Sequence, residues 1–214
     1  MSKKKSDKLV SRNYMFEIRA EEIESGGVIV GRPIVYDSRT DLGPFDEIIE
    51  LGALDECDLT DVRFLVNHDT SKIPLARSRR NNGSSTMHLS VDQYGLAIRV
   101  KLDIENNMEA RALYSAVQRG DITGMSFKFS IDEERWDNLD SDHPIRHILK
   151  IGTVIEVSAV TFPAYEGTEI DARDKTALDN ARHALESAQE ERETAVDTDE
   201  VTKLKLQIKI LGGL

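Results

Sequence analysis

The stretch Asp121–Ile131 reads DITGMSFKFSI, and the fold that the sequence predicts is built around it. Its residues alternate with a period of two, the repeat of a β-strand with one face in the core. The apolar face holds Met125, Phe127, Phe129 and Ile131, and the opposite face holds Gly124, Ser126, Lys128 and Ser130. The missing side chain of Gly124 lets another backbone come close. The pattern predicts a half-buried strand with the Ser126 hydroxyl on its more polar side.

Two other stretches supply partners for such a hydroxyl. Val62–Asp69 is an apolar strand pattern that runs into His68, and Ile151–Tyr165 is an apolar run in which Glu156 is the only charged residue. An unpaired carboxylate in apolar surroundings is costly, and a histidine is its natural partner. The chain therefore offers a base, a nucleophile and an orienting acid in the order His68, Ser126, Glu156.

Each of these three residues, taken alone, also fits a purely structural role without catalysis. Ser126 fits a surface serine, His68 fits a histidine that ends a core strand, and Glu156 fits an ion pair with an arginine. If Glu156 is not the orienting acid, Asp69 is the next carboxylate to consider.

Several short motifs occur together with these three residues. In chain order they are Glu47–Leu54, Asn67–Asp69, Pro74–Leu75, Gly95–Leu96, Gly124–Phe127 with Phe129, Glu156–Ser158 and Phe162–Tyr165. Over roughly residues 14–170, the chain resembles the prohead (capsid maturation) proteases of tailed phages, which are similar in fold to the herpesvirus assemblins. Ala76 and Lys128 stand where this resemblance leads us to expect glycine, and Lys128 brings a positive charge near Ser126.

The resemblance implies a serine endopeptidase with a His68–Ser126–Glu156 triad on a small closed or nearly closed β-barrel flanked by helices. It further implies that the enzyme cleaves scaffold or major capsid protein inside the assembling prohead, in the bacterial host cytoplasm, and cuts itself. Assemblins carry an arginine pair for the oxyanion hole where this chain has Ala164 and Tyr165, so a backbone N–H near Pro163–Tyr165 is expected instead. The alternative is a non-enzymatic capsid-assembly or scaffolding protein on the same fold.

The composition of the chain argues against several other classes of protein. The chain has 214 residues and a formal net charge of −11, which argues against broad binding to nucleic acid or to anionic membranes. No apolar run is long enough to span a bilayer, and the basic segment Met1–Lys8 precedes no apolar stretch of a signal peptide. The single Cys57 excludes an internal disulfide and fits a reducing compartment. The sequence leaves open whether the protein forms a homo-oligomer.

The pattern along the chain predicts a strand-dominated β or α+β fold with about eight strands. We expect a disordered basic tail over residues 1–12, a protease domain over 13–170, and a helical or partly disordered tail over 171–214. One internal helix is expected over Met108–Gln118, capped by Asn106 or Asn107 and ended by Gly120, with Met108, Ala112, Leu113 and Val117 as its apolar stripe. Asp132–Asp142, which holds Trp136, is expected to be an exposed turn.

Three other groups of residues have the composition of a site. His143 and His147 have the spacing of a helical metal pair, but Pro144 lies between them, so neither a metal nor a cofactor is expected. Arg77, Arg79 and Arg80 fit a solvated loop, or the border of a substrate cleft. Cys57 with His68 could form a thiol-protease pair, but the acidic setting of Cys57 disfavours a thiolate.

Overall fold

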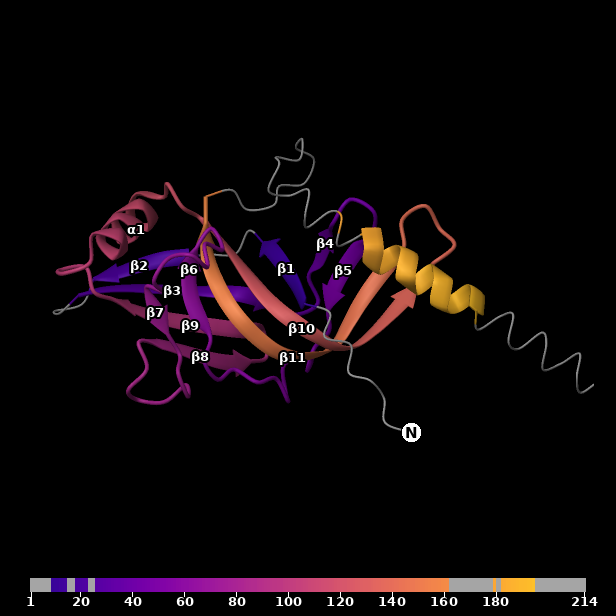
Figure 1. Cartoon of the computed structure of the whole chain (residues 1–214), viewed down its shortest axis with the longest axis horizontal. Coiled ribbons are helices and arrows are strands. Elements are labelled where there is room, and N and C mark those ends of the chain that lie inside the picture. Colours follow the sequence, from indigo (N-terminus) through magenta and orange to yellow (C-terminus); the bar gives the residue numbers. More distant parts are fainter. Residues whose placement is uncertain (1–8, 15–17, 23–25, 162–178, 180–181, 195–214) are drawn as a thin grey trace, which may run out of the picture.

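The computed structural model describes residues 9–14, 18–22, 26–161, 179 and 182–194. This part of the chain is a strand-dominated α+β structure with two β-sheets and two helices (Figure 1). The fold class expected from the sequence is therefore confirmed at this level. A closed barrel is not found among the described residues, because the strands divide between a seven-stranded and a four-stranded sheet.

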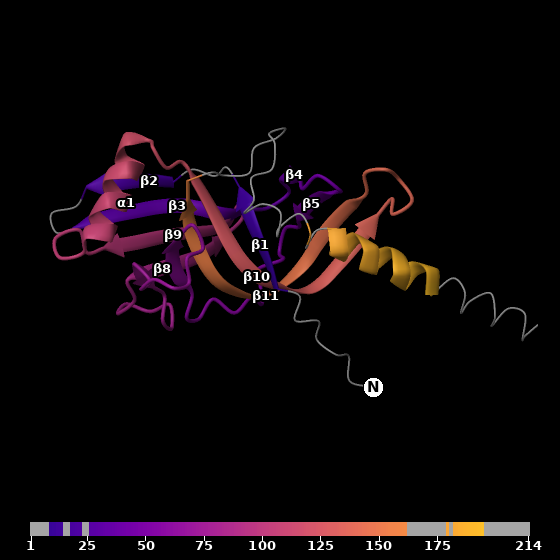
Figure 2. The ribbon, with the colours of Figure 1, turned by 45° about the horizontal axis from the view of Figure 1, so that its top comes forward.

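The larger sheet is organised around a long antiparallel ribbon of β10 (Gly124–Asp137) and β11 (Ile145–Val160). The free edge of β11 pairs in parallel with two short strands, first β5 (Asp46–Ile49) and then β6 (Arg63–Val66). Both views in Figures 1 and 2 show the ribbon curving from the middle of the molecule to the end at which the loop between its two strands lies. One long strand thus holds two separate parts of the chain in register.

Three shorter strands complete this sheet. β1 (Leu9–Tyr14) pairs with the outer edge of β10, β4 (Arg39–Asp41) pairs with β5, and β7 (Ala76–Arg77) pairs with β6. β1 begins at Leu9, so this strand overlaps the segment 1–12 for which the sequence suggests a disordered tail.

The smaller sheet has the order β2 (Ile18–Glu22), β3 (Gly27–Val35), β9 (Gly95–Leu102), β8 (Met87–Asp92), and all neighbours are antiparallel. The pairs β2–β3 and β8–β9 are each consecutive in the chain and form two antiparallel hairpins. Their inward side chains join those of the ribbon in one hydrophobic core, which includes Ile29, Ile34, Met87, Leu96, Val100, Phe127 and Phe129.

The internal helix α1 (Met108–Arg119) has the predicted caps. The Asn107 side chain accepts hydrogen bonds from the backbone N–H groups of Glu109 and Ala110, and Gly120 ends the helix with a φ of 79°. The predicted apolar stripe is half wrong, because Met108 is 81% exposed and Ala112 is exposed. The buried stripe is Ala110, Leu113, Tyr114 and Val117. These four follow the i, i+3, i+4, i+7 spacing from Ala110 and bring the large Tyr114 ring inward.

The prediction of an exposed turn over Asp132–Asp142 is wrong for its first half, since β10 continues to Asp137. Trp136 packs edge-to-face against Phe45, with ring centroids 4.7 Å apart. The Arg146 guanidinium lies 5.5 Å from the Trp136 ring centroid and is fully buried. Arg146 is also paired with Glu134 and with Glu47 of β5, so one acid of this segment and one of β5 neutralise a buried cation.

Residues 182–194 form the second helix, which lies beside the end of the β10–β11 ribbon (Figure 1). Arg192 of this helix is paired with Asp140, and Gln189 donates a hydrogen bond to the Leu139 carbonyl at 3.4 Å. Within the described residues, neither helix has the length and apolar character of a membrane span.

Candidate active site

Ser126 lies near the start of β10 and is fully buried. In the antiparallel register, Ser126 stands directly opposite Ser158 of β11, and Lys128 stands directly opposite Glu156. Directly opposed residues of an antiparallel pair point to the same face, as do residues two apart on one strand. Ser126, Glu156 and Ser158 therefore share one face of the ribbon.

His68 is brought to this face by β6 and the turn that follows it. β6 runs parallel to β11, with Leu65 beside Ser158 and Val66 beside Ala159. The next two residues, Asn67 and His68, have φ values of 51° and 56°, in the left-handed region where residues other than glycine are uncommon. This sharp turn directs the chain back toward β11 immediately after the strand ends.

The Asn67 side chain clamps this turn to the end of β11. Its amide nitrogen donates to Thr161 Oγ1 at 3.0 Å, and its amide oxygen accepts from the Thr161 backbone N–H at 3.0 Å. The Asn67 backbone N–H also donates to the Ala159 carbonyl at 2.9 Å. These contacts offset the cost of two consecutive left-handed residues, which is on the order of 1–3 kcal/mol each.

The turn brings His68 into contact with Glu156, whose carboxylate is almost completely buried. His68 Nδ1 hydrogen-bonds Glu156 Oε1, and the other carboxylate oxygen accepts from the Ser158 hydroxyl at 2.6 Å. The His68 side chain keeps 28% of its surface exposed, whereas that of Glu156 keeps 3%. The acid is therefore shielded from water while the imidazole stays accessible, and this is the partner that an isolated buried carboxylate requires.

The three residues singled out by the sequence thus lie on two neighbouring strands and the turn beside them. Sequence reasoning missed Ser158 and Asn67, although both stand inside the quoted motifs Glu156–Ser158 and Asn67–Asp69. Ser158 could have been noticed as a polar residue in an otherwise apolar strand. Asn67 could have been noticed as an asparagine, a residue that tolerates the left-handed region, directly before His68. The expected oxyanion-hole segment Pro163–Tyr165 lies outside the described residues.

Asp69, the alternative acid, has a local structural role. Its Oδ1 atom accepts hydrogen bonds from the Ser71 backbone N–H at 3.1 Å and from the Ser71 hydroxyl at 2.5 Å. Such contacts to a residue two positions on are typical of a turn. Asp69 therefore shapes the loop after His68, and Glu156 is the carboxylate that contacts the imidazole.

The two other histidines of interest bind separate partners. His143 Nε2 lies 3.1 Å from Asp46 Oδ1, whereas His147 Nδ1 lies 2.5 Å from Glu50 Oε1. His143, Asp46 and Asp41 offer three potential ligand atoms within 4.8 Å of one another. However, Asp46 is also paired with Arg39, a cation that occupies one of its oxygens. Burial raises the pKa of Asp46, but the hydrogen bonds from His143 and Arg39 outweigh it and lower that pKa overall.

Cys57 lacks the properties of a nucleophile. Burial raises the pKa of its thiol to about 12, and the nearby Asp58 and Asp132 charges act in the same direction. The thiolate is the reactive form of cysteine, so this side chain stays protonated and unreactive near neutral pH. The thiol-protease interpretation is therefore disfavoured.

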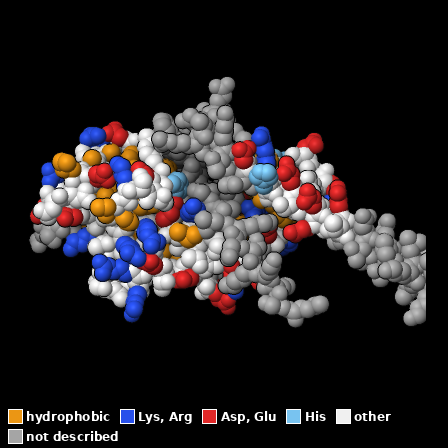
Figure 3. Space-filling model, in the orientation of Figure 1, with side chains coloured by type: hydrophobic (Ala, Val, Ile, Leu, Met, Phe, Trp, Pro, Cys, Tyr) orange, Lys and Arg blue, Asp and Glu red, His pale blue; other side chains and the backbone are white. Residues whose placement is uncertain are grey.

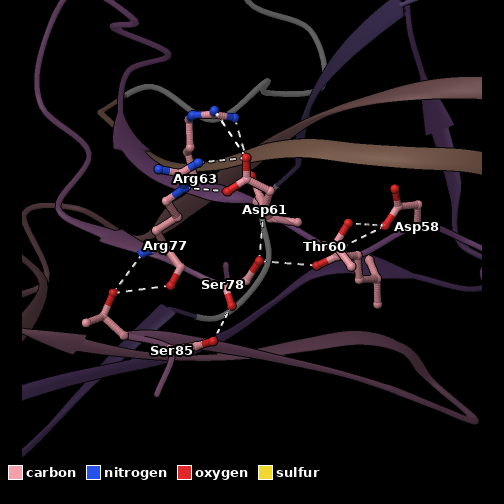
Figure 4. A network of polar contacts seen from close by, with 10 residues as sticks. Asp58, Thr60, Asp61, Arg63, Arg77, Ser78 and Ser85 are labelled. Atoms are coloured by element: carbon pink, nitrogen blue, oxygen red, sulfur yellow. Dashed lines mark hydrogen bonds and ion pairs between the residues drawn. The ribbon is translucent and has the colours of Figure 1, made fainter. Parts of the chain in front are cut away.

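The basic loop, which holds Arg77, Arg79 and Arg80, forms a second polar cluster at the other end of β6 from His68. Arg77 pairs with Asp61 through two hydrogen bonds, one of them 2.7 Å long, and this pairing lowers the pKa of Asp61 (Figure 4). Arg77, Arg79 and Arg80 line an open cleft of about 830 Å³. Lys and Arg side chains gather on this side of the molecule in Figure 3, near β7 and β8 of Figure 1. The basic loop is therefore ordered and forms a positively charged rim of this cleft.

Comparison with known proteins places the chain in a family. In a structural comparison, the chain is similar to the bacteriophage T4 capsid assembly protease gp21. The match covers 72% of this chain and 99% of that protein, with 13% sequence identity and a TM-score of 0.43. No curated protein matches the sequence. A family model of the caudovirus prohead serine proteases matches residues 15–183, which is most of the chain. The chain belongs to the caudovirus prohead serine proteases, a family of capsid maturation peptidases.

Proposed function

We propose that the protein is a serine endopeptidase in which Ser126 is the nucleophile, His68 the general base and Glu156 the orienting acid. The observation that carries the proposal is the contact between His68 Nδ1 and the buried Glu156 carboxylate, on the face of the ribbon that also holds Ser126. A nucleophile, a base and a carboxylate that orients the base are the three parts of a serine protease site.

The direction of the hydrogen bonds supports these roles. An ionised carboxylate can only accept, so the proton in the His68–Glu156 contact belongs to Nδ1 of the imidazole. Nε2 is then the basic nitrogen, which takes the proton from the Ser126 hydroxyl as its oxygen attacks the peptide carbonyl. The buried negative charge of Glu156 stabilises the imidazolium that forms, and shielding from water strengthens this attraction.

The reaction then follows from these roles. The Ser126 oxygen becomes bonded to the carbonyl carbon, and His68 passes the captured proton to the leaving amine as the peptide bond breaks. A water molecule, deprotonated by the same imidazole, hydrolyses the resulting ester and regenerates the Ser126 hydroxyl. Backbone N–H groups are the expected donors to the oxyanion.

The proposed substrates are the scaffold or the major capsid protein, cut in the host cytoplasm within the assembling prohead. The test is co-expression with the capsid and scaffold proteins of the same phage, with either the wild-type chain or the Ser126→Ala variant, followed by mass spectrometry of both proteins. New termini that arise only with wild type support the proposal. Intact capsid and scaffold proteins in assembled shells with wild type would favour the alternative, a non-enzymatic assembly protein.

Replacing Glu156 by glutamine is expected to slow cleavage by roughly 100- to 10,000-fold without abolishing it. The amide can still hold the imidazole, but it lacks the charge that stabilises the imidazolium. The measurement is the cleavage rate beside wild type and Ser126→Ala. A Glu156→Gln variant as fast as wild type would assign the orienting role to another acid, and Asp69→Asn would be the next variant.

We further propose that the protease removes its own tail between Asp171 and Val201. This stretch includes the helix of residues 182–194, which contacts the ribbon through Arg192 and Gln189 and buries little besides Ala184. A weakly held segment is where proteolysis is easiest. Intact mass is followed during incubation of wild type and Ser126→Ala under conditions in which wild type cleaves capsid protein. Shortening of wild type alone is expected, and a tail that stays attached, or is lost equally from both, would contradict self-cleavage.

A further inference from the structure

Ser158 connects His68 to Glu156 by a second route, besides the direct contact of the two side chains. Its Oγ atom accepts a hydrogen bond from the His68 backbone N–H at 3.2 Å and donates one to Glu156 Oε2 at 2.6 Å. The direct contact of His68 Nδ1 with Glu156 Oε1 closes the circuit. The three residues therefore form a closed ring of hydrogen bonds.

The chemistry of the groups fixes the direction of each bond in this ring. A backbone N–H can only donate and a carboxylate can only accept, so the single Ser158 proton points at Glu156. With one carboxylate oxygen bound to Ser158, the other is turned toward the imidazole. Ser158 is fully buried, so water does not compete with these bonds.

We propose that Ser158 is a positioning residue, which holds the His68 backbone in its left-handed turn and the Glu156 carboxylate in the orientation that receives Nδ1–H. This inference rests on the proposed triad and adds a fourth member to it. The same ring explains which of two adjacent serines reacts. Ser126 and Ser158 are directly opposed and both are buried, but the Ser158 hydroxyl already donates its proton to the Glu156 carboxylate.

The experiment compares three variants of the full chain. Ser158→Ala removes the hydroxyl, and Ser158→Thr keeps it on a residue that suits a strand. Ser130→Ala is the matched control, because Ser130 also lies on the ribbon and its hydroxyl accepts the Thr153 backbone N–H at 3.0 Å. Thermal unfolding is measured for all three. If Ser158→Ala does not fold, a folded Ser158→Thr that loses both the reaction rate and the His68 signal described below overturns the inference.

The first readout is the rate at which a fluorophosphonate probe modifies Ser126, with the modified residue located by peptide mass spectrometry. Loss of a hydrogen bond to a charged group is expected to slow Ser158→Ala by about 10- to 100-fold. Ser158→Thr is expected to recover most of the rate, and Ser130→Ala is expected to react as fast as wild type.

The second readout does not depend on reactivity. A ring proton shared between a histidine and a carboxylate gives a proton NMR signal downfield of the backbone amides, and labelling histidine with ¹⁵N identifies it as a ring N–H. Its absence from His68→Ala assigns it to His68 rather than to His147, whose Nδ1 contacts Glu50. We expect this signal in wild type, Ser130→Ala and Ser158→Thr, and its loss in Ser158→Ala. If wild type does not react with the probe outside the shell, the NMR comparison decides by itself.

If Ser158→Ala folds, four results would overturn the inference. They are modification of Ser158 itself, an unchanged rate in Ser158→Ala, equal slowing in Ser158→Ala and Ser130→Ala, and an unchanged His68 signal in Ser158→Ala. Failure of the triad is a distinct result, because a Ser126→Ala variant that still cleaves removes the proposed function whatever Ser158 does.

Discussion

We expect alanine in place of Ser126 or His68 to reduce cleavage of capsid or scaffold protein to the background rate, a loss on the order of a million-fold. In the proposed mechanism, no acyl-enzyme can form without Ser126, and no base removes the hydroxyl proton at neutral pH without His68. The proposed triad makes the two side chains a unit, so the double variant is expected to be little worse than either single one. The measurement is the appearance of cleaved product during co-expression.

Two replacements elsewhere serve as matched controls for this prediction. Ser130→Ala removes another hydroxyl of β10, and His88→Ala removes an exposed imidazole of β8. Both variants are expected to cleave at the wild-type rate. His88→Ala is expected to unfold at the wild-type temperature, and Ser130→Ala at a slightly lower one, because the Thr153 backbone N–H loses its acceptor. Substantial turnover by Ser126→Ala, or an additive loss in the double variant, would contradict the assignment of the triad.

The largest expected effect on stability is that of Gly95→Ala, which we expect to lower the free energy of unfolding by about 3 kcal/mol or more. Gly95 begins β9 with a φ of 129°, and a Cβ atom there would lie 2.1 Å from the Ile34 carbonyl oxygen. That oxygen is backbone of the neighbouring β3, so it cannot move aside without opening the smaller sheet. Urea unfolding of both proteins measures the difference.

Gly120→Ala separates the two causes of this loss. Gly120 also has a positive φ, of 79°, but a Cβ atom there would meet nothing within 4 Å. The variant is expected to lose only about 1 kcal/mol, the cost of the left-handed backbone alone. Equal losses at the two positions would show that the clash with Ile34 adds nothing.

The sequence predicts the local elements well where one periodicity dominates. Alternation over Gly124–Ile131 gives the start of β10, and Asn107 and Gly120 mark the ends of α1 through their capping chemistry. The pairing of His68 with Glu156 could also be anticipated, because a lone carboxylate in an apolar run requires a partner.

The rest depends on contacts between distant parts of the chain. The acids near Trp136 read as a turn, yet Glu134 and Trp136 extend β10 because they surround the buried Arg146. Met108 fits a helical stripe, but Tyr114 fills the space above Gly27, where a Cβ atom would lie 2.7 Å from the ring. Ser158 has no periodicity that distinguishes it from a core serine, and only the approach of His68 gives its hydroxyl a role.

The most direct measurement is peptide mass spectrometry of the chain after fluorophosphonate treatment of cells that co-express the capsid and scaffold proteins. The proposed triad predicts modification of the wild-type chain at Ser126 alone. It predicts no modification of His68→Ala beyond the background, although that variant keeps the Ser126 hydroxyl. Modification at another serine, or equal modification of Ser126 in wild type and His68→Ala, would contradict it.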